Sequence, residues 1–568
     1  MSHTSSTTVT TPDGLRLAVQ EHGDPAAPTV VAVHGYPDDH TVWDGVVAAL
    51  RDTHHVVTYD VRGAGASDAP RNRAGYHVDR LADDLAAVLD AVGPDRPVHL
   101  LAHDWGAIQT WHAVTDPRLR RRVASYTSIS GPCLDHVGAW LRGRGEVRAK
   151  LRQSLASWYI GFFRTPVLPE LAWRSGLFGR VLARLAGIPR PAVSDGVRGL
   201  ELYRCNIAAR LANPEVRRTD VPVQVLAPTG DSYVTTPMQT RIEPFVDDLR
   251  IRRLPAGHWV PRTHPEIVAR CVRELVAHVE GGPEAPSLRR ARVGNGRWTD
   301  RLVVVTGAGS GIGRATALAF AGRGAEVVVA DRDLDSARQT AELAERLGAR
   351  ASARQVDVSD GEAMDAFAKQ VAAEHGVPDV VVNNAGIGMA GPFADTTVAD
   401  WQKIIDVNLW GVIHGCRLFG AQLREHGEGG HIVNVASAAA YLPQRTLSAY
   451  ATTKSAVLTL SECLRAELAD HGIGVTALCP GFVHTNITAT TRFVGVDAAT
   501  EHHRQQATTA LYKKRNYTPE RVAAEVVRAV ERDVALAPVT PEAHLGLLAS
   551  RLTPGLLRAM ARREIGPR

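Results

Sequence analysis

Gly281 to Trp298 reads GGPEAPSLRRARVGNGRW, and it separates two stretches of sequence that each resemble a complete α/β domain. The segment has no hydrophobic periodicity and is rich in Gly, Pro and Arg, which is typical of an inter-domain linker. A chain of 568 residues is too long for one ordinary core, so two domains of similar size fit it best. We therefore expect a first domain at 1–280, a linker at 281–298 and a second domain at 299–568.

The composition excludes several classes of protein. The chain is 45% hydrophobic and 22% charged, as globular proteins are, and it has no apolar run of the ~20 residues that a membrane-spanning helix needs. Its first residues lack the basic start and apolar core of a secretory signal, so we expect a cytoplasmic protein. The six cysteines are scattered without CxxC pairs, which indicates reduced thiols and no metal site.

The net charge of +5 is small for this length, and much of the excess arginine lies in the linker and the C-terminal tail. We expect no nucleic-acid partner, because no stripe of basic residues is interleaved with stacking aromatics. The tail from Leu545 to Arg562 is basic and partly apolar, so a peripheral contact with a membrane surface stays open. A helix pair that packs on its own domain or on a partner subunit is the favoured interpretation.

Three short apolar runs in the first half end in polar turns that contain glycine, as buried parallel strands do. They are 30–33 before HGYP, 56–59 before DVRG, and 98–102 before HDWGA. An apolar helix follows the third run. Small residues at 102, 106 and 107 allow the sharp turn between strand and helix that exposes residue 104, which is the arrangement of a nucleophile elbow.

Asp104 occupies the nucleophile position, where a serine would indicate an esterase or lipase. A carboxylate that attacks an sp³ carbon forms an alkyl-enzyme ester, which a water molecule must then hydrolyse. That water needs a base, and the base needs an orienting acid. Asp231 follows the apolar run 223–227, and His258 follows the run 249–254. Nucleophile, acid and histidine thus occur in the chain order of an α/β-hydrolase, and we predict all three as catalytic.

The motifs HGYP (34–37), AHDWGA (102–107), GD (230–231) and GHWVP (257–261) together resemble the epoxide hydrolases of the α/β-hydrolase superfamily, over approximately residues 8–279. This resemblance implies an α/β-hydrolase fold for the first domain. It also implies that the backbone N–H groups of Tyr36 and Trp105 form the oxyanion hole for ester hydrolysis, a task suited to fixed donors in a dry pocket.

An opened epoxide is an alkoxide that must be protonated, and epoxide hydrolases carry two tyrosines for this step on an inserted helical cap. Residues 132–218 lie between two strands of the first domain and are expected to form that cap. WYIGFF (158–163) and LYRCN (202–206) resemble the two family motifs, so Tyr159 and Tyr203 are the expected acids. Haloalkane dehalogenases share most of this frame, and Trp105 keeps a dehalogenase as the alternative.

The second half begins with an apolar run at 302–306, which is followed by GAGSGIG (307–313) and a helix from about residue 314. Glycines let the backbone approach a pyrophosphate, which then lies at a helix N-terminus. The cofactor contacts expected from this turn are Gly307, Ser310, Gly311, Ile312 and Gly313. The next strand ends in Asp331, whose carboxylate would bind ribose hydroxyls and repel a 2′-phosphate. We therefore predict NAD rather than NADP, with Arg332 as the reservation.

Later motifs resemble the classical short-chain dehydrogenases, over roughly residues 301–536, and imply a Rossmann fold. They are DV (357–358), NNAG (383–386), Asn408, Ser437, Tyr450 with Lys454, and PG (480–481). Tyr450 and Lys454 lie four residues apart on one helix face, so the ammonium can lower the pKa of the phenol. A phenol poised nearer neutrality can take the proton of an alcohol while hydride leaves its carbon.

The same resemblance assigns further roles. Ser437 would hydrogen-bond the substrate oxygen, and Asn408 would hold a water in a proton relay from Lys454. Asp357 would contact the adenine, Asn383 the ribose region and Thr485 the nicotinamide carboxamide. The complete set of cofactor contacts expected beyond Asp331 is Asp357, Val358, Asn384, Ala385, Gly386, Tyr450, Lys454, Pro480, Gly481 and Thr485.

Together these predictions describe a bifunctional enzyme, an epoxide hydrolase joined to an NAD-dependent short-chain dehydrogenase that interconverts a secondary alcohol and a ketone. The apolar cap could accept a lipid-like epoxide, and the second site could oxidise the resulting diol. We expect a homo-oligomer formed through the dehydrogenase domain. The alternatives are a dehalogenase in the first half, or one idle domain that serves only for binding or assembly.

Overall fold

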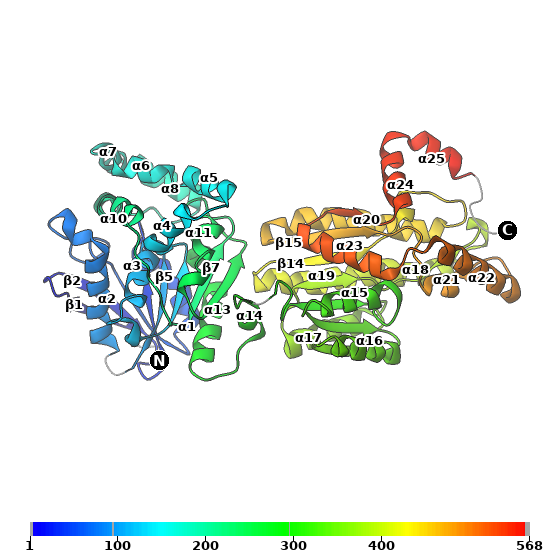
Figure 1. Ribbon diagram of the computed structural model, residues 1–568, viewed down its shortest axis with the longest axis horizontal. Helices are drawn as coiled ribbons and strands as arrows, with labels where there is room; N and C mark the ends of the chain where they lie inside the picture. Colours follow the sequence, from blue (N-terminus) through cyan, green and yellow to red (C-terminus); the bar gives the residue numbers. More distant parts are fainter. Residues whose placement is uncertain (1–3, 94–95, 295, 563–568) are drawn as a thin grey trace. The chain divides into compact units, whose positions relative to one another are not determined.

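The computed structural model describes residues 4–93, 96–294 and 296–562, and it consists of two compact α/β units, Met1–Gly294 and Asn295–Arg568 (Figure 1). Each unit has its own β-sheet, and helices cover it. The α/β fold class predicted from the strand and turn patterns is confirmed in both units. Among the described residues, no helix is long and apolar enough to cross a membrane.

The first unit is built on an eight-stranded sheet with the strand order β1-β2-β4-β3-β5-β6-β7-β8. The two strands at one edge run antiparallel, and the sheet is parallel from β4 to β8. The strands are β1 (Thr4–Thr10), β2 (Arg16–His22), β3 (Thr29–Val33), β4 (His55–Tyr59), β5 (Val98–His103), β6 (Val123–Ile129), β7 (Val223–Pro228) and β8 (Leu249–Leu254).

Helices cover both faces of this sheet, and a separate helical cap is inserted between β6 and β7 (Figure 1). The covering helices are α1 (Asp44–Leu50), α2 (Val78–Val92), α3 (Trp105–Val114), α11 (Thr236–Thr240), α12 (Val260–Thr263), α13 (Pro265–Val279) and α14 (Pro286–Arg290). The cap consists of α4 (Leu134–Arg142), α5 (Val147–Ala156), α6 (Trp158–Arg164), α7 (Leu168–Arg174), α8 (Leu177–Ala186), α9 (Val193–Arg198) and α10 (Leu200–Ala212).

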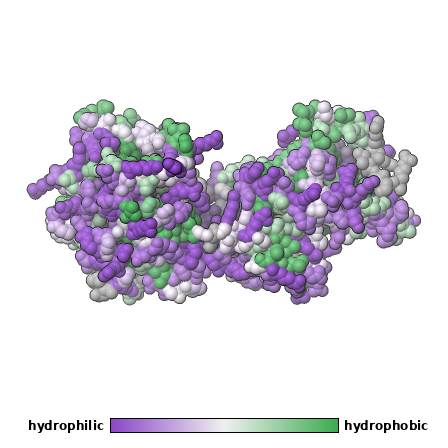
Figure 2. Space-filling model, in the orientation of Figure 1, coloured by the Kyte–Doolittle hydropathy of each residue, from purple (hydrophilic) through white to green (hydrophobic). Residues whose placement is uncertain are grey.

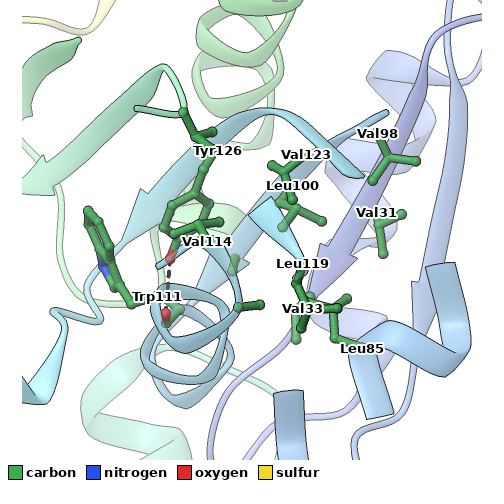
Figure 3. Close-up of a cluster of buried hydrophobic side chains, with 14 of the residues drawn as sticks. Val31, Val33, Leu85, Val98, Leu100, Trp111, Val114, Leu119, Val123 and Tyr126 are labelled. Atoms are coloured by element: carbon green, nitrogen blue, oxygen red, sulfur yellow. Dashed lines mark hydrogen bonds between the residues drawn. The ribbon is translucent and has the colours of Figure 1, made fainter. Parts of the chain in front are cut away.

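The central strands of the first unit are apolar on both faces because helices cover both sides of the sheet. Val31, Val33 and Leu100 are fully buried in one cluster with Trp111 of α3 and Tyr126 of β6 (Figure 3). The hydroxyl of Tyr126 donates a hydrogen bond to the backbone oxygen of Ala107, at 2.9 Å. This bond satisfies the polar end of a buried aromatic ring and attaches β6 to α3, the helix that follows the predicted elbow.

The second unit is built on a seven-stranded parallel sheet in the order β11-β10-β9-β12-β14-β15-β17, with a small pair β13-β16 beside it. The chain order reverses between β9 and β12, and ligands of open α/β sheets bind at such a switch point. The strands are β9 (Leu302–Thr306), β10 (Glu326–Asp331), β11 (Ala351–Gln355), β12 (Val380–Asn383), β13 (Met389–Ala390), β14 (Gly430–Val435), β15 (Ile473–Cys479), β16 (Arg492–Phe493) and β17 (Leu536–Pro538).

The α-helices of this unit alternate with its strands. They are α15 (Gly311–Ala321), α16 (Leu334–Arg346), α17 (Gly361–His375), α18 (Val398–Ile405), α19 (Gly411–His426), α20 (Ser448–Leu468), α21 (Ile487–Thr490), α22 (Ala498–Arg515), α23 (Pro519–Arg532), α24 (Pro541–Leu552) and α25 (Pro554–Met560). α15 begins three residues earlier than expected, so the last glycines of the turn belong to the helix. α24 and α25 form the helix pair expected in the C-terminal tail.

Most of the segment expected as a linker packs onto one unit or the other. Leu288 on α14 is fully buried, and the N–H of Val293 bonds to the backbone oxygen of Leu249 on the edge strand β8. Trp298 lies in the core of the second unit, against Phe320, and its indole N–H bonds to Glu531. Residue 295, in the same segment, lies outside the described residues.

Candidate active sites

Asp104 lies on the sharp turn between β5 and α3, with backbone angles φ 52° and ψ −123°. A non-glycine residue rarely adopts this conformation, and its neighbours must be small for it to persist. A Cβ on Gly106 would lie 2.2 Å from the backbone oxygen of Val33, and one on Gly131 would lie 2.1 Å from that of Asp104. The glycines therefore let the chain turn tightly enough to direct the Asp104 carboxylate out of the sheet.

The three predicted catalytic residues of the first unit converge at the carboxyl ends of β5, β7 and β8. The Nδ1 of His258 lies 2.9 Å from an oxygen of Asp231, and its Nε2 lies 3.6 Å from Oδ2 of Asp104. Asp231 is held in place because its other oxygen accepts the N–H groups of Tyr233 and Val234. One ring nitrogen of His258 is therefore bound to an acid, and the other points to the nucleophile.

Burial and charge set the protonation of this group. Burial raises the pKa of Asp104 to about 6, and nearby His258 opposes that rise. Burial would lower the pKa of His258, but the carboxylates of Asp231 and Asp104 outweigh it and raise this pKa to about 9. At neutral pH most Asp104 side chains are therefore ionised beside a protonated His258.

The backbone N–H groups of Tyr36 and Trp105, the expected oxyanion hole, lie close to the Asp104 carboxylate. The N–H of Tyr36 donates to Oδ1 of Asp104 at 2.8 Å, and the N–H of Trp105 also bonds to this carboxylate. Oδ1 is thus held by the fixed N–H of Tyr36, whereas Oδ2 faces His258. If Oδ2 attacks an alkyl carbon, Oδ1 becomes the ester carbonyl oxygen and already occupies an oxyanion hole.

Tyr159 of α6 and Tyr203 of α10 meet above this carboxylate, with their ring centroids 6.0 Å apart. Burial, together with the charge of Asp104 nearby, raises the pKa of Tyr159, and burial likewise raises the pKa of Tyr203. Both phenols therefore stay protonated and can serve as proton donors. The Trp105 ring packs edge-on against Tyr203, with centroids 5.0 Å apart.

The structure adds two residues to this site that the motifs did not single out. Asp38, directly after HGYP, is buried and accepts the indole N–H of Trp259 at 2.8 Å. Tyr233 lies between the catalytic groups, with its ring 5.0 Å from that of His258 and 5.4 Å from that of Tyr159. The positions of both next to recognised motifs were the only sequence signal for them.

In the second unit, the glycine-rich turn leads directly into the N-terminus of α15. Gly307 and Gly311 have φ values of 62° and 55°, which favour glycine. The side chain of Ser310, at the N-cap, makes no capping hydrogen bond, whereas Asp333 and Asp360 cap the helices that follow. The first N–H groups of α15 thus lack a side-chain partner, which fits the binding of a pyrophosphate.

The other residues expected around a cofactor border this turn. Oδ2 of Asp331 accepts the N–H of Gly309 at 2.8 Å, so its carboxylate lies at the end of β10 beside the turn. Thr485 lies close to Gly311, the first residue of α15. A Cβ added to Gly311 would lie 3.4 Å from the Cβ of Thr485. Asn384 donates to the backbone oxygens of Thr306 and Gly307, and it thereby joins the loop after β12 to the turn.

Asp357, Val358 and Asn383 also make contacts within the unit. Asp357 accepts hydrogen bonds from both the N–H and the hydroxyl of Ser359. The side chain of Val358 is buried and packs against Gly411. Asn383 was expected near the cofactor ribose, but its side chain is buried and donates to Asn434 across the sheet at 2.9 Å. It therefore joins β12 to β14.

Ser437, Tyr450, Lys454 and Asn408 surround one point at the carboxyl ends of β12 and β14. Gly386 marks the convergence, because a Cβ there would lie 3.2 Å from Oδ1 of Asn408 and 3.4 Å from Nζ of Lys454. The Ser437 side chain lies beside the Tyr450 phenol and lowers its pKa against the larger opposing effect of burial. Asn408 lies in a π-helical turn, Asp406–Trp410, and its amide bonds to both backbone groups of Ile387.

The expected effect of Lys454 on Tyr450 is not found in this structure. Burial raises the pKa of Tyr450, and only Ser437 opposes the rise. The ammonium of Lys454 donates to the backbone oxygen of Val435 at 2.8 Å, and burial lowers its own pKa to about 8. Spacing along the helix predicted that the two side chains share a face, but Nζ of Lys454 lies over the Tyr450 ring, 5.9 Å from its centroid.

Each of the two units matches a known protein family. Residues 28–265 match the family described as alpha/beta hydrolase fold, and residues 301–493 match the family described as short chain dehydrogenase. The protein named "Probable oxidoreductase EphD" of Mycobacterium tuberculosis is 42% identical over 583 residues, which cover 98% of each chain. This chain belongs to the same two-domain family.

Solved structures resemble one unit each. A short-chain dehydrogenase from Burkholderia phymatum in complex with NAD is 29% identical, with a TM-score of 0.42, and covers 47% of this chain and 97% of its own. An epoxide hydrolase from metagenomes of hot environments is 24% identical, with a TM-score of 0.41, and covers 48% and 98%.

The resemblance of the first half to α/β-hydrolases and of the second half to short-chain dehydrogenases is thus confirmed. The chain is an enzyme with a hydrolase unit and an oxidoreductase unit, and the second unit implies a nicotinamide cofactor. When bound, such a cofactor accepts or supplies a hydride. The free N–H groups of α15 and the convergence at Gly386 fit this group.

Proposed function

We propose that the first unit hydrolyses an epoxide to a vicinal diol through an ester on Asp104. The observation that carries this proposal is the meeting of the Asp104 carboxylate, paired with His258, and two protonated phenols in one buried site. A dehalogenase needs a halide site, and it has no use for two proton donors. An esterase needs a hydroxyl or thiol nucleophile where this chain has Asp104.

The proposed reaction has two steps. Oδ2 of Asp104 attacks an epoxide carbon, the ring C–O bond breaks, and Tyr159 or Tyr203 donates a proton to the alkoxide. His258 then takes a proton from a water molecule, whose oxygen attacks the ester carbonyl carbon. The acyl C–O bond breaks, and its oxygen leaves as the second hydroxyl of the diol with the proton that His258 took. The proton of the new Asp104 carboxyl group then restores the tyrosine. Because the ester carries no charge, one of the carboxylates that raise the pKa of His258 is lost in the first step. This loss lowers the pKa of His258, so the imidazole gives up its proton to solvent and is neutral when the second step needs a base.

A substrate panel tests this proposal. The full chain is incubated with short and fatty epoxides, haloalkanes and aryl esters, and diol, halide and phenol are measured. We expect diol from at least one epoxide, and little release of halide or phenol. Release of halide faster than formation of any diol would instead establish the dehalogenase alternative.

We propose that the second unit oxidises a secondary alcohol, or reduces the corresponding ketone, with NAD. The convergence of Tyr450, Ser437 and Lys454 supports this reaction, since a phenol beside Ser437 can exchange a proton with the substrate oxygen. The diol from the first site is a candidate alcohol, and NADH formed from an epoxide plus NAD would link the two sites. Diol without NADH would separate them and leave each activity in place.

Replacing Asp331 by Asn tests the preference for NAD. The amide keeps an acceptor for the N–H of Gly309 but removes the negative charge that would repel a 2′-phosphate. We expect the ratio of kcat/KM for NAD over NADP to fall by about tenfold or more. The exposed Asp335, one turn further on, provides the control, and Asp335→Asn should leave the ratio unchanged. A wild-type preference for NADP would contradict this proposal directly.

A further inference from the structure

The cap of the first unit carries a concentration of large, exposed apolar side chains. Throughout the described part of that unit, every large apolar side chain that stands well exposed lies between Leu141 and Val216. Figure 2 shows apolar residues along the rim of this unit, where α5–α8 lie in Figure 1. Scattered apolar residues need no explanation, but their concentration on one subdomain indicates an interaction surface.

These side chains form stripes on two cap helices. On α5, Val147, Leu151 and Leu155 are spaced by four residues and are 74%, 61% and 68% exposed. Residues four apart lie on the same face of a helix. α6 continues the surface with Trp158, which is 69% exposed.

α8 repeats the arrangement with Leu177, Val181 and Leu185, which are 61%, 45% and 83% exposed. Its adjoining face provides Phe178, which packs on Trp173 of α7 with ring centroids 4.9 Å apart. The cap core is therefore made by one set of residues, while a second set faces outward. The outward stripes are additional to what folding of the cap requires.

A strong positive charge accompanies this surface. Residues 142–190 contain ten Lys or Arg and two acidic residues, whereas the whole chain has a net charge of only +5. Both acids are paired, Glu146 with Arg241 and Glu170 with Arg204. Arginines directly follow stripe residues on α5, at Arg148 and Arg152, so the basic and apolar groups share one region.

We propose that the cap docks on a lipid bilayer that carries anionic headgroups. The stripes of α5 and α8, with Trp158, would enter the interface, and the neighbouring arginines would bind the headgroups. Charge complementarity selects this occupant, because a surface with such an excess of cations matches an anionic bilayer. Long basic side chains also extend along apolar surface to reach headgroups.

This docking does not depend on the proposed chemistry, but it would give that chemistry a substrate class. Trp158 and Tyr159 are neighbours on α6, yet Trp158 faces outward while Tyr159 contacts Tyr203 in the buried site. A single helix therefore connects the docking surface with the catalytic phenols. An epoxide carried on an acyl chain would be the matching substrate.

Co-sedimentation of the full chain with vesicles tests the docking. Vesicles of phosphatidylcholine alone are compared with vesicles that also contain phosphatidylglycerol, at low and high salt. We expect binding to the anionic vesicles that weakens as salt rises. A Leu151→Glu/Leu155→Glu/Leu185→Glu variant should lower the partition coefficient at least about tenfold. These side chains are exposed, so the variant should fold, and circular dichroism checks this.

A matched variant distinguishes the cap from another exposed apolar surface, which lies on α24. α24 also exposes Leu545, Leu548 and Leu552, at 68%, 55% and 70%. The Leu545→Glu/Leu548→Glu/Leu552→Glu variant should bind vesicles as the wild type does. Loss of binding in this variant but not in the cap variant would overturn the proposal.

Two further results would also overturn the proposal. The first is wild-type protein that stays in solution with anionic vesicles. The second is an oligomer, seen by light scattering without lipid, that the cap variant dissociates, because the surface would then join two copies of the chain. The substrate panel is read separately, since diol formation from short epoxides requires no bilayer.

Discussion

Asp104→Asn abolishes diol formation, lowering kcat by about 10⁴-fold or more, because an amide cannot displace the ring oxygen of an epoxide. The replacement has nearly the same shape, and its oxygen can still accept the N–H of Tyr36. Burial raises the pKa of the Asp104 carboxyl group, which means that its charged form is costly in the folded protein. Because asparagine removes that charge, the variant should fold at least as well as the wild type. Diol formation is measured with the best epoxide of the panel.

The control for Asp104→Asn is present in the same polypeptide. Because the dehydrogenase site lies in the other unit, oxidation of an alcohol supplied directly should proceed at the wild-type rate. Retention of diol formation by the variant would exclude Asp104 as the nucleophile. The His258→Gln variant provides direct evidence for the ester, in addition to the loss of activity in Asp104→Asn. It should leave the first step possible and prevent the second, so that mass spectrometry detects the alkyl-enzyme ester as an added substrate mass on Asp104.

Tyr450→Phe lowers kcat of the dehydrogenase by about 10²- to 10⁴-fold, the usual contribution of a positioned acid or base. Its phenol lies beside Ser437, and phenylalanine keeps the ring while removing only the phenol oxygen. NADH formation or consumption is followed by absorbance. Binding of NADH, followed by fluorescence, should be largely retained, since the glycine-rich turn and α15 are untouched.

Tyr517→Phe is the matched control for Tyr450→Phe. Its hydroxyl donates to the backbone oxygen of Val539 at 2.7 Å, so the change should cost about 1 kcal/mol of unfolding free energy. We expect its turnover to remain close to that of the wild type. Equal loss of turnover in the two variants would mean that Tyr450 acts through stability and would remove it from the proposed mechanism.

Local patterns were sufficient to predict the elements that carry the two sites. Apolar runs followed by glycine-containing turns identified β5 and β9, because a buried parallel strand must be apolar on both faces and must end in a turn. The elbow was predictable because only small residues tolerate the approach found at Gly106. Asp38 and Tyr233 carried no such local requirement, and their roles arise from contacts with residues far away in the chain.

The sequence by itself determined that this protein has two α/β units and which residues stand at the strand ends, since periodicity, turn chemistry and chain order are local properties. Only the tertiary structure decided how those residues interact. The pKa of Asp104 and that of Lys454 depend on burial, and the cap surface depends on which face of each helix is left uncovered. These pKa values and the exposure of the cap surface are set by residues distant in sequence. Desolvation and packing depend on distance in space rather than on spacing along the chain.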